Sequence, residues 1–303
     1  MSVFTPVDRT QLMPWLAAHG IHELFAMSGI AGGAVNTNYW LQTDQGDWVL
    51  TLVEDRPLSA VEPIMQLMQT LAEAELEVPA VRPDNHGQLV SELHDRPATL
   101  VQALPGQHPT MSAVSAIAVG RFLANLHGLI LPLPGLPLNF GPDWQRETVA
   151  VWQPRLNIEQ RALMQRAWDV SARVWSQPWP AGWIHADLFP DNVLMTGNLL
   201  QGVIDWYFAS VGPRIWDIAV TLNAWGGSKG VEQGLNRNLL QAYQTIQPLS
   251  GAEMSALPAM RISAALRFWL SRLNAADHQH GDSDQVTVKS PADYETLLLD
   301  LLQ

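Results

Sequence analysis

One short segment of the chain combines residue types that are suited to phosphoryl transfer. It runs from Trp183 to Leu194 and reads W-I-H-A-D-L-F-P-D-N-V-L, so that Asp187 follows His185 by two residues and precedes Asn192 by five. This His-x-Asp-x4-Asn spacing is typical of the catalytic loop of phosphoryl-transfer enzymes. In such a loop the carboxylate accepts the proton of an attacking hydroxyl, and the amide oxygen binds a metal ion. We therefore assign Asp187 and Asn192 to a catalytic loop.

A second carboxylate lies where a metal-binding partner of this loop is expected. Asp205 ends the apolar run Val203-Ile204 and lies 18 residues after Asp187, a separation that suits a loop, a hairpin and a return to the same site. Mg²⁺ prefers hard oxygen ligands, and cations stabilise the charge of the transferred phosphoryl group. We expect Asp205 and Asn192 to bind Mg²⁺, with ATP as the phosphoryl donor and Asp187 free of the metal.

Three polar residues near the loop have more modest interpretations. His185 is expected to hold the loop by a hydrogen bond, and Asp191 to be a turn or capping residue. Asp217 opens a helix twelve residues after Asp205. It is either a carboxylate that interacts with the helix dipole, a support for the catalytic loop, or part of the acceptor pocket.

Glycines at residues 28–38 offer a place for phosphate oxygens. The segment reads S-G-I-A-G-G-A-V-N-T-N, and glycines let backbone amides approach a phosphate closely. The alternative is an ordinary glycine turn between two strands. The residues that we assign to the nucleotide are Gly29, Gly32, Gly33, Thr51, Gln102 and Ala103.

The first hundred residues have the pattern of an antiparallel sheet with two helices. Thr5-Pro6 has the form of an N-cap and first helical residue, and predicts a helix to about residue 18. Apolar residues at helical spacing predict a second helix over residues 59–74. Alternation and turn residues predict strands over residues 35–41, 48–54, 88–92 and 98–103. Leu104-Pro105-Gly106 is a candidate hinge, so residues 1–103 are expected to form a nucleotide-binding lobe.

Beyond the hinge the chain is helical. Helices are expected over residues 112–129, 159–175, 214–224, 232–246, 252–277 and 292–302. The proline-rich residues 131–142 are expected to form an extended loop. Residues 104–303 would form a catalytic and substrate-binding lobe. The fold class is therefore α+β, with a small sheet-rich lobe, a larger helical lobe and a ligand cleft between them.

Composition excludes several classes of function. The chain has 303 residues, 47% of them hydrophobic, and a net charge of −12, so a broad nucleic-acid surface is not expected. It has no cysteine, which removes disulfides and thiolate metal sites. No apolar run reaches the roughly 18 residues of a membrane span, and the first 20 residues lack the pattern of a signal peptide. We expect a cytoplasmic monomer or homodimer that acts on a small molecule, without a membrane partner.

Three segments together resemble a known family. They are His185–Leu194, Val203–Trp206 and Trp216–Ala219, and they are similar to the aminoglycoside-phosphotransferase and choline-kinase superfamily. Within it, the segments at residues 1–5, 29–31, 49–54, 205–209, 221–225 and 267–272 most resemble bacterial homoserine kinases of that fold. The resemblance implies a bilobal protein-kinase-like fold. It also implies phosphorylation of the L-homoserine hydroxyl by ATP and Mg²⁺, which gives O-phospho-L-homoserine in threonine biosynthesis.

The chain departs from this family at one position. Kinases of this shape usually carry a phosphate-binding lysine on the third strand, where this sequence has Thr51. Its two lysines, Lys229 and Lys289, are far along the chain. Either Mg²⁺, loop amides and Arg56 hold the phosphates, or catalysis has been lost. The intact Asp187, Asn192 and Asp205 favour the first interpretation.

A homoserine pocket needs a cation for the α-carboxylate and acceptors for the α-ammonium. Arg267 and Arg272 lie on one helix about 500° apart, so only one is expected to reach the pocket. Asn223 and Asp217 are our candidates for the ammonium group. The alternatives are a kinase for choline, ethanolamine, methylthioribose or an aminoglycoside, a nucleotide-binding pseudokinase, or a protein Ser/Thr kinase.

Overall fold

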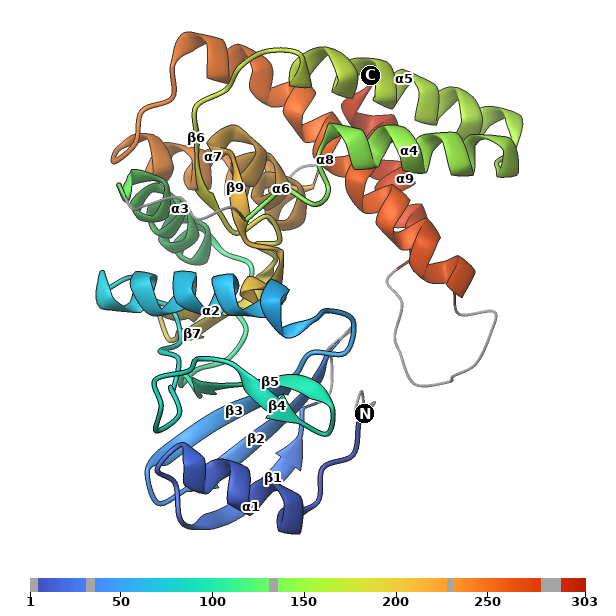
Figure 1. Cartoon of the computed structure of the whole chain (residues 1–303). Coiled ribbons are helices and arrows are strands. Elements are labelled where there is room, and N and C mark those ends of the chain that lie inside the picture. The colour runs from blue at the N-terminus through green and yellow to red at the C-terminus, as the bar shows by residue number, and fades with distance from the viewer. Residues whose placement is uncertain (1–4, 31–35, 131–135, 228–230, 279–289) are drawn as a thin grey trace. The chain divides into compact units, whose positions relative to one another are not determined.

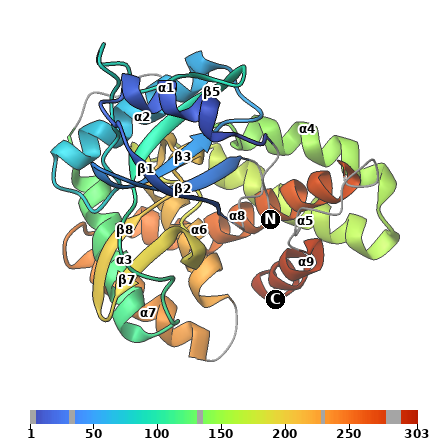
Figure 2. The ribbon, with the colours of Figure 1, turned by 90° about the horizontal axis from the view of Figure 1, so that it is seen from below.

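The computed structural model describes residues 5–30, 36–130, 136–227, 231–278 and 290–303 (Figure 1). The chain forms two compact units. The first comprises Met1–Gly106 and Gln201–Tyr207, and the second comprises Gln107–Leu200, Phe208–Asp282 and Val288–Gln303. Figure 2 gives a second view of the same ribbon.

A five-stranded antiparallel sheet forms the centre of the first unit. Its strands follow the order β1-β2-β3-β5-β4. The strands are β1 (Leu24–Gly29), β2 (Thr37–Thr43), β3 (Gly46–Leu52), β5 (Arg96–Gln102) and β4 (Ser91–Leu93). In β2 and β3, Thr51 pairs with Asn38 and Leu50 with Tyr39, which directs alternate residues to opposite faces. The predicted antiparallel sheet is thus confirmed.

Helix α1 (Arg9–Ala18) packs against this sheet through Leu12, Trp15 and Leu16. The expected start of α1 at Thr5-Pro6 is wrong. Asp8 is the N-cap, and its carboxylate accepts from the backbone N–H groups of Thr10 and Gln11. An aspartate side chain satisfies two otherwise unpaired donors at this helix end.

Helix α2 (Leu58–Glu73) confirms the prediction of a helix over residues 59–74. Its buried face is formed by Val61, Ile64, Met65, Leu67, Met68 and Leu71, which recur at the spacing of an amphipathic helix. Between Leu52 and the start of α2, the chain passes through Glu54, Asp55 and Arg56. The polar connection places Arg56 two residues before the helix.

The second unit is mainly helical, and its described helices agree with the predicted ones to within two residues, apart from one addition. They are α3 (Ala113–Gly128), α4 (Pro142–Trp152), α5 (Ile158–Trp175), α6 (Arg214–Gly226), α7 (Val231–Gln244), α8 (Gly251–His278) and α9 (Pro291–Leu301). Strands β6 (Ala181–Ile184) and β9 (Ser210–Pro213) form an antiparallel pair. Strands β7 (Val193–Thr196) and β8 (Leu199–Val203) follow the catalytic loop in the chain. In the described ranges, no helix is both long and apolar enough to cross a membrane.

Helix α4 is the addition, since the sequence pattern did not predict it. Two of its four buried residues, Gln145 and Thr148, are polar, so it lacks a continuous apolar stripe. The fully buried Gln145 is satisfied by Ser171, which donates to its amide oxygen at 2.7 Å. A buried amide needs such partners, and they come from distant parts of the chain that local periodicity cannot show.

Candidate active site

The catalytic loop begins where strand β6 ends. Ala186 has a left-handed backbone with φ 63°, so the chain turns sharply between His185 and Asp187. Asp217, in the first turn of α6, holds the backbone at His185 and Ala186 by hydrogen bonds. Its Oδ2 accepts from the backbone N–H of His185 and its Oδ1 from that of Ala186, both at 2.8 Å. A carboxylate that accepts two backbone N–H groups fixes the loop geometry.

Asp217 is fully buried and ionised. Burial alone would raise the pKa of this carboxyl, but the hydrogen bond and charge of His127, the charge of His185 and the backbone N–H of His185 together hold the pKa below its ordinary value. His127 in turn contacts the hydroxyl of Tyr243 at 3.0 Å. The support of the loop is therefore a connected polar network, which extends from α6 to α3 and α7.

Asp187 and Asn192 are joined at the two ends of the loop. The side-chain nitrogen of Asn192 donates to the backbone oxygen of Asp187 at 2.8 Å and to its Oδ2 at 3.3 Å. His185 Nδ1 accepts from the backbone N–H of Asp187 at 3.2 Å. These bonds set the direction of the Asp187 side chain.

Arg267 is the charged partner of Asp187. Its Nη1 lies 3.6 Å from Asp187 Oδ1, and only 3% of the residue is exposed. The guanidinium lies over the rings of Phe140, Phe208 and Phe268, with its carbon 4.4, 5.3 and 3.8 Å from their centroids. Burial lowers the pKa of Arg267, while the charge of Asp187 raises it. An arginine remains charged in such a setting, so Asp187 faces a permanent cation.

Asp205 belongs to the first unit and lies just beyond strand β8. It is exposed and has a left-handed backbone with φ 62°. Two residues later, Tyr207 is anchored to the sheet, because its hydroxyl lies 3.1 Å from Thr99 Oγ1 and also bonds with Thr51. The segment that carries Asp205 is therefore fixed to strands β3 and β5.

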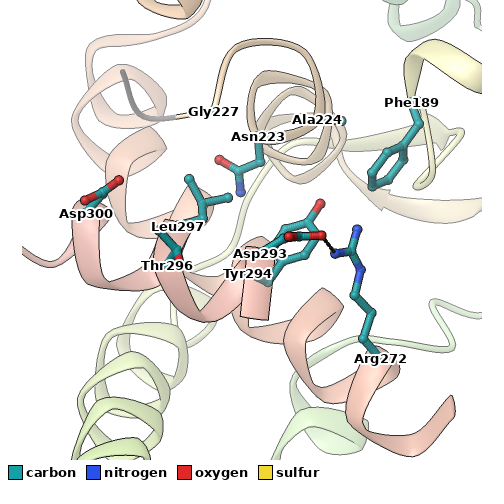
Figure 3. Close-up of a pocket in the computed structure, with 10 residues that line it drawn as sticks. All are labelled: Phe189, Asn223, Ala224, Gly227, Arg272, Asp293, Tyr294, Thr296, Leu297 and Asp300. Atoms are coloured by element: carbon teal, nitrogen blue, oxygen red, sulfur yellow. Dashed lines mark hydrogen bonds and ion pairs between the residues drawn. The ribbon is translucent and has the colours of Figure 1, made fainter. Parts of the chain in front are cut away.

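A pocket of about 310 Å³ opens beside the catalytic loop within the second unit (Figure 3). Phe189, two residues after Asp187, forms part of its wall. The other residues that line it are Asn223, Ala224, Gly227, Arg272, Asp293, Tyr294, Thr296, Leu297 and Asp300.

The charges of this pocket are arranged around Tyr294. Arg272 lies over the Tyr294 ring, 4.5 Å from its centroid, and its Nη1 donates to Asp293 Oδ2 at 2.8 Å. Burial raises the pKa of Tyr294, so the phenol stays neutral. Figure 3 draws Arg272 and Asp300 at opposite ends of the pocket. Among the described lining residues, the cation Arg272 lies with the carboxylates of Asp293 and Asp300, an arrangement that suits a small zwitterion.

Comparison with known proteins assigns this geometry to a family. The sequence pattern of the phosphotransferase enzyme family matches residues 26–253, more than half of the chain. The chain belongs to the phosphotransferase enzyme family. It is similar to a homoserine kinase of Methylobacillus flagellatus, with 36% identity over 98% of this chain and 94% of the relative. It is equally similar to a homoserine kinase of Pseudomonas aeruginosa, with 36% identity over 98% of this chain and 96% of the relative.

Solved structures show the same phosphotransferase fold at low sequence identity. An amicoumacin kinase, solved with AMP-PNP, Ca²⁺ and its substrate, has a TM-score of 0.74 and 13% identity, over 98% of this chain and 93% of that one. A spectinomycin phosphotransferase, solved with ADP and spectinomycin, has a TM-score of 0.69 and 16% identity, over 98% of both chains. These likenesses confirm the predicted protein-kinase-like α+β fold.

The four residues that we expected to bind the substrate of this phosphotransferase lie in three different places. Arg272 and Asn223 line the pocket, and the Asn223 amide is held by Arg261 through a 2.9 Å bond to its oxygen. Arg267 instead faces Asp187. Asp217 lies beneath the catalytic loop with both carboxylate oxygens engaged by backbone N–H groups. Asp217 is not among the described residues that line the pocket, and its bonds favour the interpretation of Asp217 as a support for the catalytic loop.

The residues that we expected to bind the nucleotide lie in different local structures. Gly29 ends β1, Gln102 ends β5, and the backbone N–H of Ala103 donates to the Asp47 carbonyl at 3.0 Å. Thr51 is 5% exposed, and its hydroxyl donates to Asn38 Oδ1 at 2.7 Å. Gly32 and Gly33 lie outside the described residues.

Asn192 in the second unit and Asp205 in the first each offer an oxygen of the kind that a hard cation such as Mg²⁺ binds. The nitrogen of the Asn192 amide is turned to Asp187, so its oxygen is the atom suited to a metal. Asp205 offers an exposed carboxylate. Within the described ranges no three His, Cys, Asp or Glu side chains cluster as a metal site. Mg²⁺ commonly keeps several waters and binds substrate phosphates together with one or two carboxylates.

Several residues of the site were not identified from the sequence. They are Phe140, Phe208 and Phe268 around Arg267, His127 beneath Asp217, and Phe189, Asp293, Tyr294 and Asp300 in the pocket. No spacing rule links these groups, because they come from several elements that are distant in the chain; only Asp293, Tyr294 and Asp300 share one, helix α9. Only Phe189 carried a signal, as a neighbour of the catalytic loop motif.

Proposed function

We propose that this phosphotransferase is a homoserine kinase, which transfers the γ-phosphoryl group of ATP to the hydroxyl of L-homoserine and yields O-phospho-L-homoserine and ADP. The observation that carries this proposal is the similarity to homoserine kinases over 98% of the chain, at 36% identity. The product is a precursor for threonine synthesis. A cysteine-free chain needs no oxidising compartment, and we assign the reaction to the cytoplasm.

Asp187 would orient the homoserine hydroxyl and accept its proton as the oxygen attacks the γ-phosphorus. Its position is set by Asn192, His185 and Arg267. The cation at 3.6 Å keeps Asp187 in its charged form. Positioning a reactant in this way is the main contribution that a protein makes to phosphoryl transfer.

Asn192 and Asp205 would hold Mg²⁺ on the ATP phosphates. When bound, the metal neutralises charge that develops on the phosphoryl oxygens. The hydrogen bonds of Asn192 to Asp187 would keep its amide oxygen oriented for the metal. The anchoring of Tyr207 to Thr99 would hold the Asp205 segment in place.

Homoserine would occupy the pocket beside Phe189. Arg272 Nη1 donates to Asp293 Oδ2 and to the Ser290 carbonyl. The edge formed by Nε and Nη2 can then donate two parallel hydrogen bonds to the α-carboxylate. The α-ammonium shares a carbon with that carboxylate, so its partners must lie close to Arg272. Asp293 meets this requirement, and Asn223 is the neutral acceptor in the same pocket.

The decisive experiment is an ADP-release assay with the purified protein and Mg-ATP over a panel of alcohols. The panel contains L-homoserine, D-homoserine, choline, ethanolamine, methylthioribose and an aminoglycoside. We expect turnover with L-homoserine to exceed that with each other compound by at least about a hundredfold in kcat/KM. Robust choline or aminoglycoside turnover would overturn the substrate. Clear ATP binding without turnover of any compound would establish a pseudokinase, the second candidate that Thr51 raises.

A further inference from the structure

Tyr294, in helix α9, differs from the other tyrosines of the chain in what its hydroxyl contacts. The chain has four tyrosines. The hydroxyls of the other three each have a hydrogen-bond partner within the protein: Val7 for Tyr39, Thr99 for Tyr207 and His127 for Tyr243. Tyr294 is only 4% exposed, yet no residue in the described ranges forms a hydrogen bond with its hydroxyl. Buried tyrosine hydroxyls usually have a partner, so Tyr294 is an exception among the four.

The ring of Tyr294 is fixed by packing that does not involve its hydroxyl. Tyr294, Leu297 and Leu298 form the buried face of α9. The Tyr294 ring stacks on the ring of Phe268, with centroids 5.2 Å apart and planes 16° apart. The guanidinium carbon of Arg272 lies 4.5 Å from the centroid of the Tyr294 ring. A phenylalanine could make the same contacts, so the packing fixes the direction of the hydroxyl without using it.

The Tyr294 hydroxyl faces the pocket beside the catalytic loop. Tyr294 and Arg272 both line that pocket, and Figure 3 draws the hydroxyl on the side of the ring that faces Ala224 and Phe189. Burial raises the pKa of Tyr294, so the phenol keeps its proton and can donate it in a hydrogen bond. The few polar groups in a ligand pocket fix the orientation of the ligand. The hydroxyl is therefore a donor that a molecule in this pocket can use.

A carboxylate is the ligand group that best fits this donor. The guanidinium of Arg272 lies over the ring that carries the hydroxyl, so an anion bound by Arg272 is near the phenol as well. A carboxylate has about four lone-pair sites, and two parallel bonds from an arginine use two of them. The ionised side chain of Asp293, which also lines the pocket, can only accept hydrogen bonds. The phenol can donate to a lone pair that the arginine leaves unused.

We propose that the Tyr294 hydroxyl donates a hydrogen bond to the α-carboxylate of the substrate and, together with Arg272, selects substrates that carry this group. The inference rests on the proposed function. It adds a neutral donor to the cation that lies in the same pocket. Hydrogen bonds to a charged acceptor are stronger than those between neutral groups, so removal of this one hydroxyl should weaken ligand binding measurably.

The test is calorimetric titration of wild type and Tyr294→Phe with three ligands, in the presence of Mg²⁺ and a non-hydrolysable ATP analogue. L-Homoserine carries the carboxylate, the ammonium group and the reacting hydroxyl. L-2-Aminobutyrate lacks the hydroxyl, and 3-amino-1-propanol lacks the carboxylate. We expect Tyr294→Phe to bind the first two ligands about tenfold more weakly and to change the affinity for 3-amino-1-propanol by less than about threefold.

The folding stability of the same variant gives a second measurement. The midpoint of chemical denaturation of Tyr294→Phe should equal that of the wild type, because the hydroxyl bonds to no described residue. Tyr39→Phe is the matched control, since it removes a buried hydroxyl that bonds with Val7 and Thr5. This control should have a lowered midpoint and should bind all three ligands as the wild type does.

Four results would overturn the inference. One is wild-type affinity of Tyr294→Phe for both L-homoserine and L-2-aminobutyrate. An equal loss for all three ligands would place the hydroxyl on the ammonium group, and a loss for L-homoserine and 3-amino-1-propanol alone would place it on the reacting hydroxyl. A lowered denaturation midpoint of Tyr294→Phe would show that the hydroxyl has a partner within the protein.

Failure of the inference and failure of the proposed function give different results. A wild type that neither binds nor turns over L-homoserine would overturn the proposed function and this inference with it. A wild type that turns over L-homoserine, beside a Tyr294→Phe variant that binds L-homoserine equally well, would overturn the inference alone.

Discussion

The guanidinium of Arg267 lies 3.6 Å from the carboxylate of Asp187, and three phenylalanine rings enclose it. This pair joins the end of the catalytic loop to the middle of helix α8. A buried charge of this kind is tolerated only with a partner, so the aromatic enclosure and the carboxylate depend on each other. We therefore expect Arg267 to position Asp187 and not to recognise the substrate.

Replacing Arg267 should therefore affect turnover more than substrate affinity. We expect Arg267→Met to lower kcat at least tenfold and to change the homoserine KM by less than about threefold. Arg267→Lys should recover part of kcat, since it retains the charge. Steady-state kinetics with both substrates separate these effects. A strongly raised KM at normal kcat would instead make Arg267 a substrate contact.

Asp187→Asn should abolish most turnover without loss of nucleotide binding. The amide keeps the shape of the side chain but cannot accept the proton of the attacking hydroxyl, so kcat should fall by roughly a hundredfold or more. ADP-release kinetics measure the first effect and titration with ADP the second. Near-normal kcat would contradict the assignment of Asp187.

Asp205 and Asn192 should act through the metal. Asp205→Ala should abolish Mg²⁺-dependent ATP binding, and Asn192→Ala should raise the Mg²⁺ concentration needed for half-maximal activity. Asp191→Ala is a matched control, because Asp191 is exposed in the same turn as Asn192. Unchanged ATP affinity in Asp205→Ala, measured by calorimetry over a Mg²⁺ series, would remove Asp205 from the metal site.

Arg272→Ala should raise the homoserine KM about a hundredfold and leave the ATP KM unchanged, because a forked carboxylate contact is lost. The control is Arg155→Ala, which removes an arginine paired with Asp277 at 2.9 Å where both side chains are about half exposed. It should leave both KM values as they are. If Arg272→Ala has a normal homoserine KM, the pocket beside Phe189 does not bind the carboxylate.

Glu253 should make folding stability depend on acidity. It is 1% exposed, and Arg214 donates to its two oxygens at 2.6 and 2.8 Å. Burial would raise its pKa, but Arg214 and the bonds from Ser250 lower it from 4.5 to about 2. The folded state therefore favours the ionised form, and this contribution is complete above the unfolded pKa of 4.5 and is lost as pH falls towards 2.

Chemical denaturation of wild type and Glu253→Gln at several pH values measures this pH-dependent contribution of Glu253 to the free energy of unfolding. The wild type should be more stable by on the order of 3 kcal/mol at pH 7, and the difference should shrink below pH 4.5. The control Glu159→Gln removes an exposed carboxylate from the first turn of α5 and should cost less than about 1 kcal/mol. A difference between wild type and Glu253→Gln that does not vary with pH would contradict the ionised pair.

The sequence could predict what depends on neighbours in the chain. The spacing of Asp187 and Asn192 survives into the structure because both lie in one eight-residue loop, whose geometry is local. Helix α2 could likewise be predicted from its apolar stripe. Helix α4 could not, because its buried Gln145 is stabilised by Ser171 and Ser263, which local patterns do not reveal.

Only the tertiary structure decided which partners Arg267 and Arg272 each contact. Arg267 and Arg272 are alike in sequence and share helix α8, but five residues of helical rotation bring one to Asp187 and the other to Asp293 and Tyr294. In the same way Asp217 became a support of the loop, because the turn after β6 presents two backbone N–H groups to it. The sequence determined the charges available for catalysis. Which partner each charge meets was decided by packing between elements that are distant in the chain.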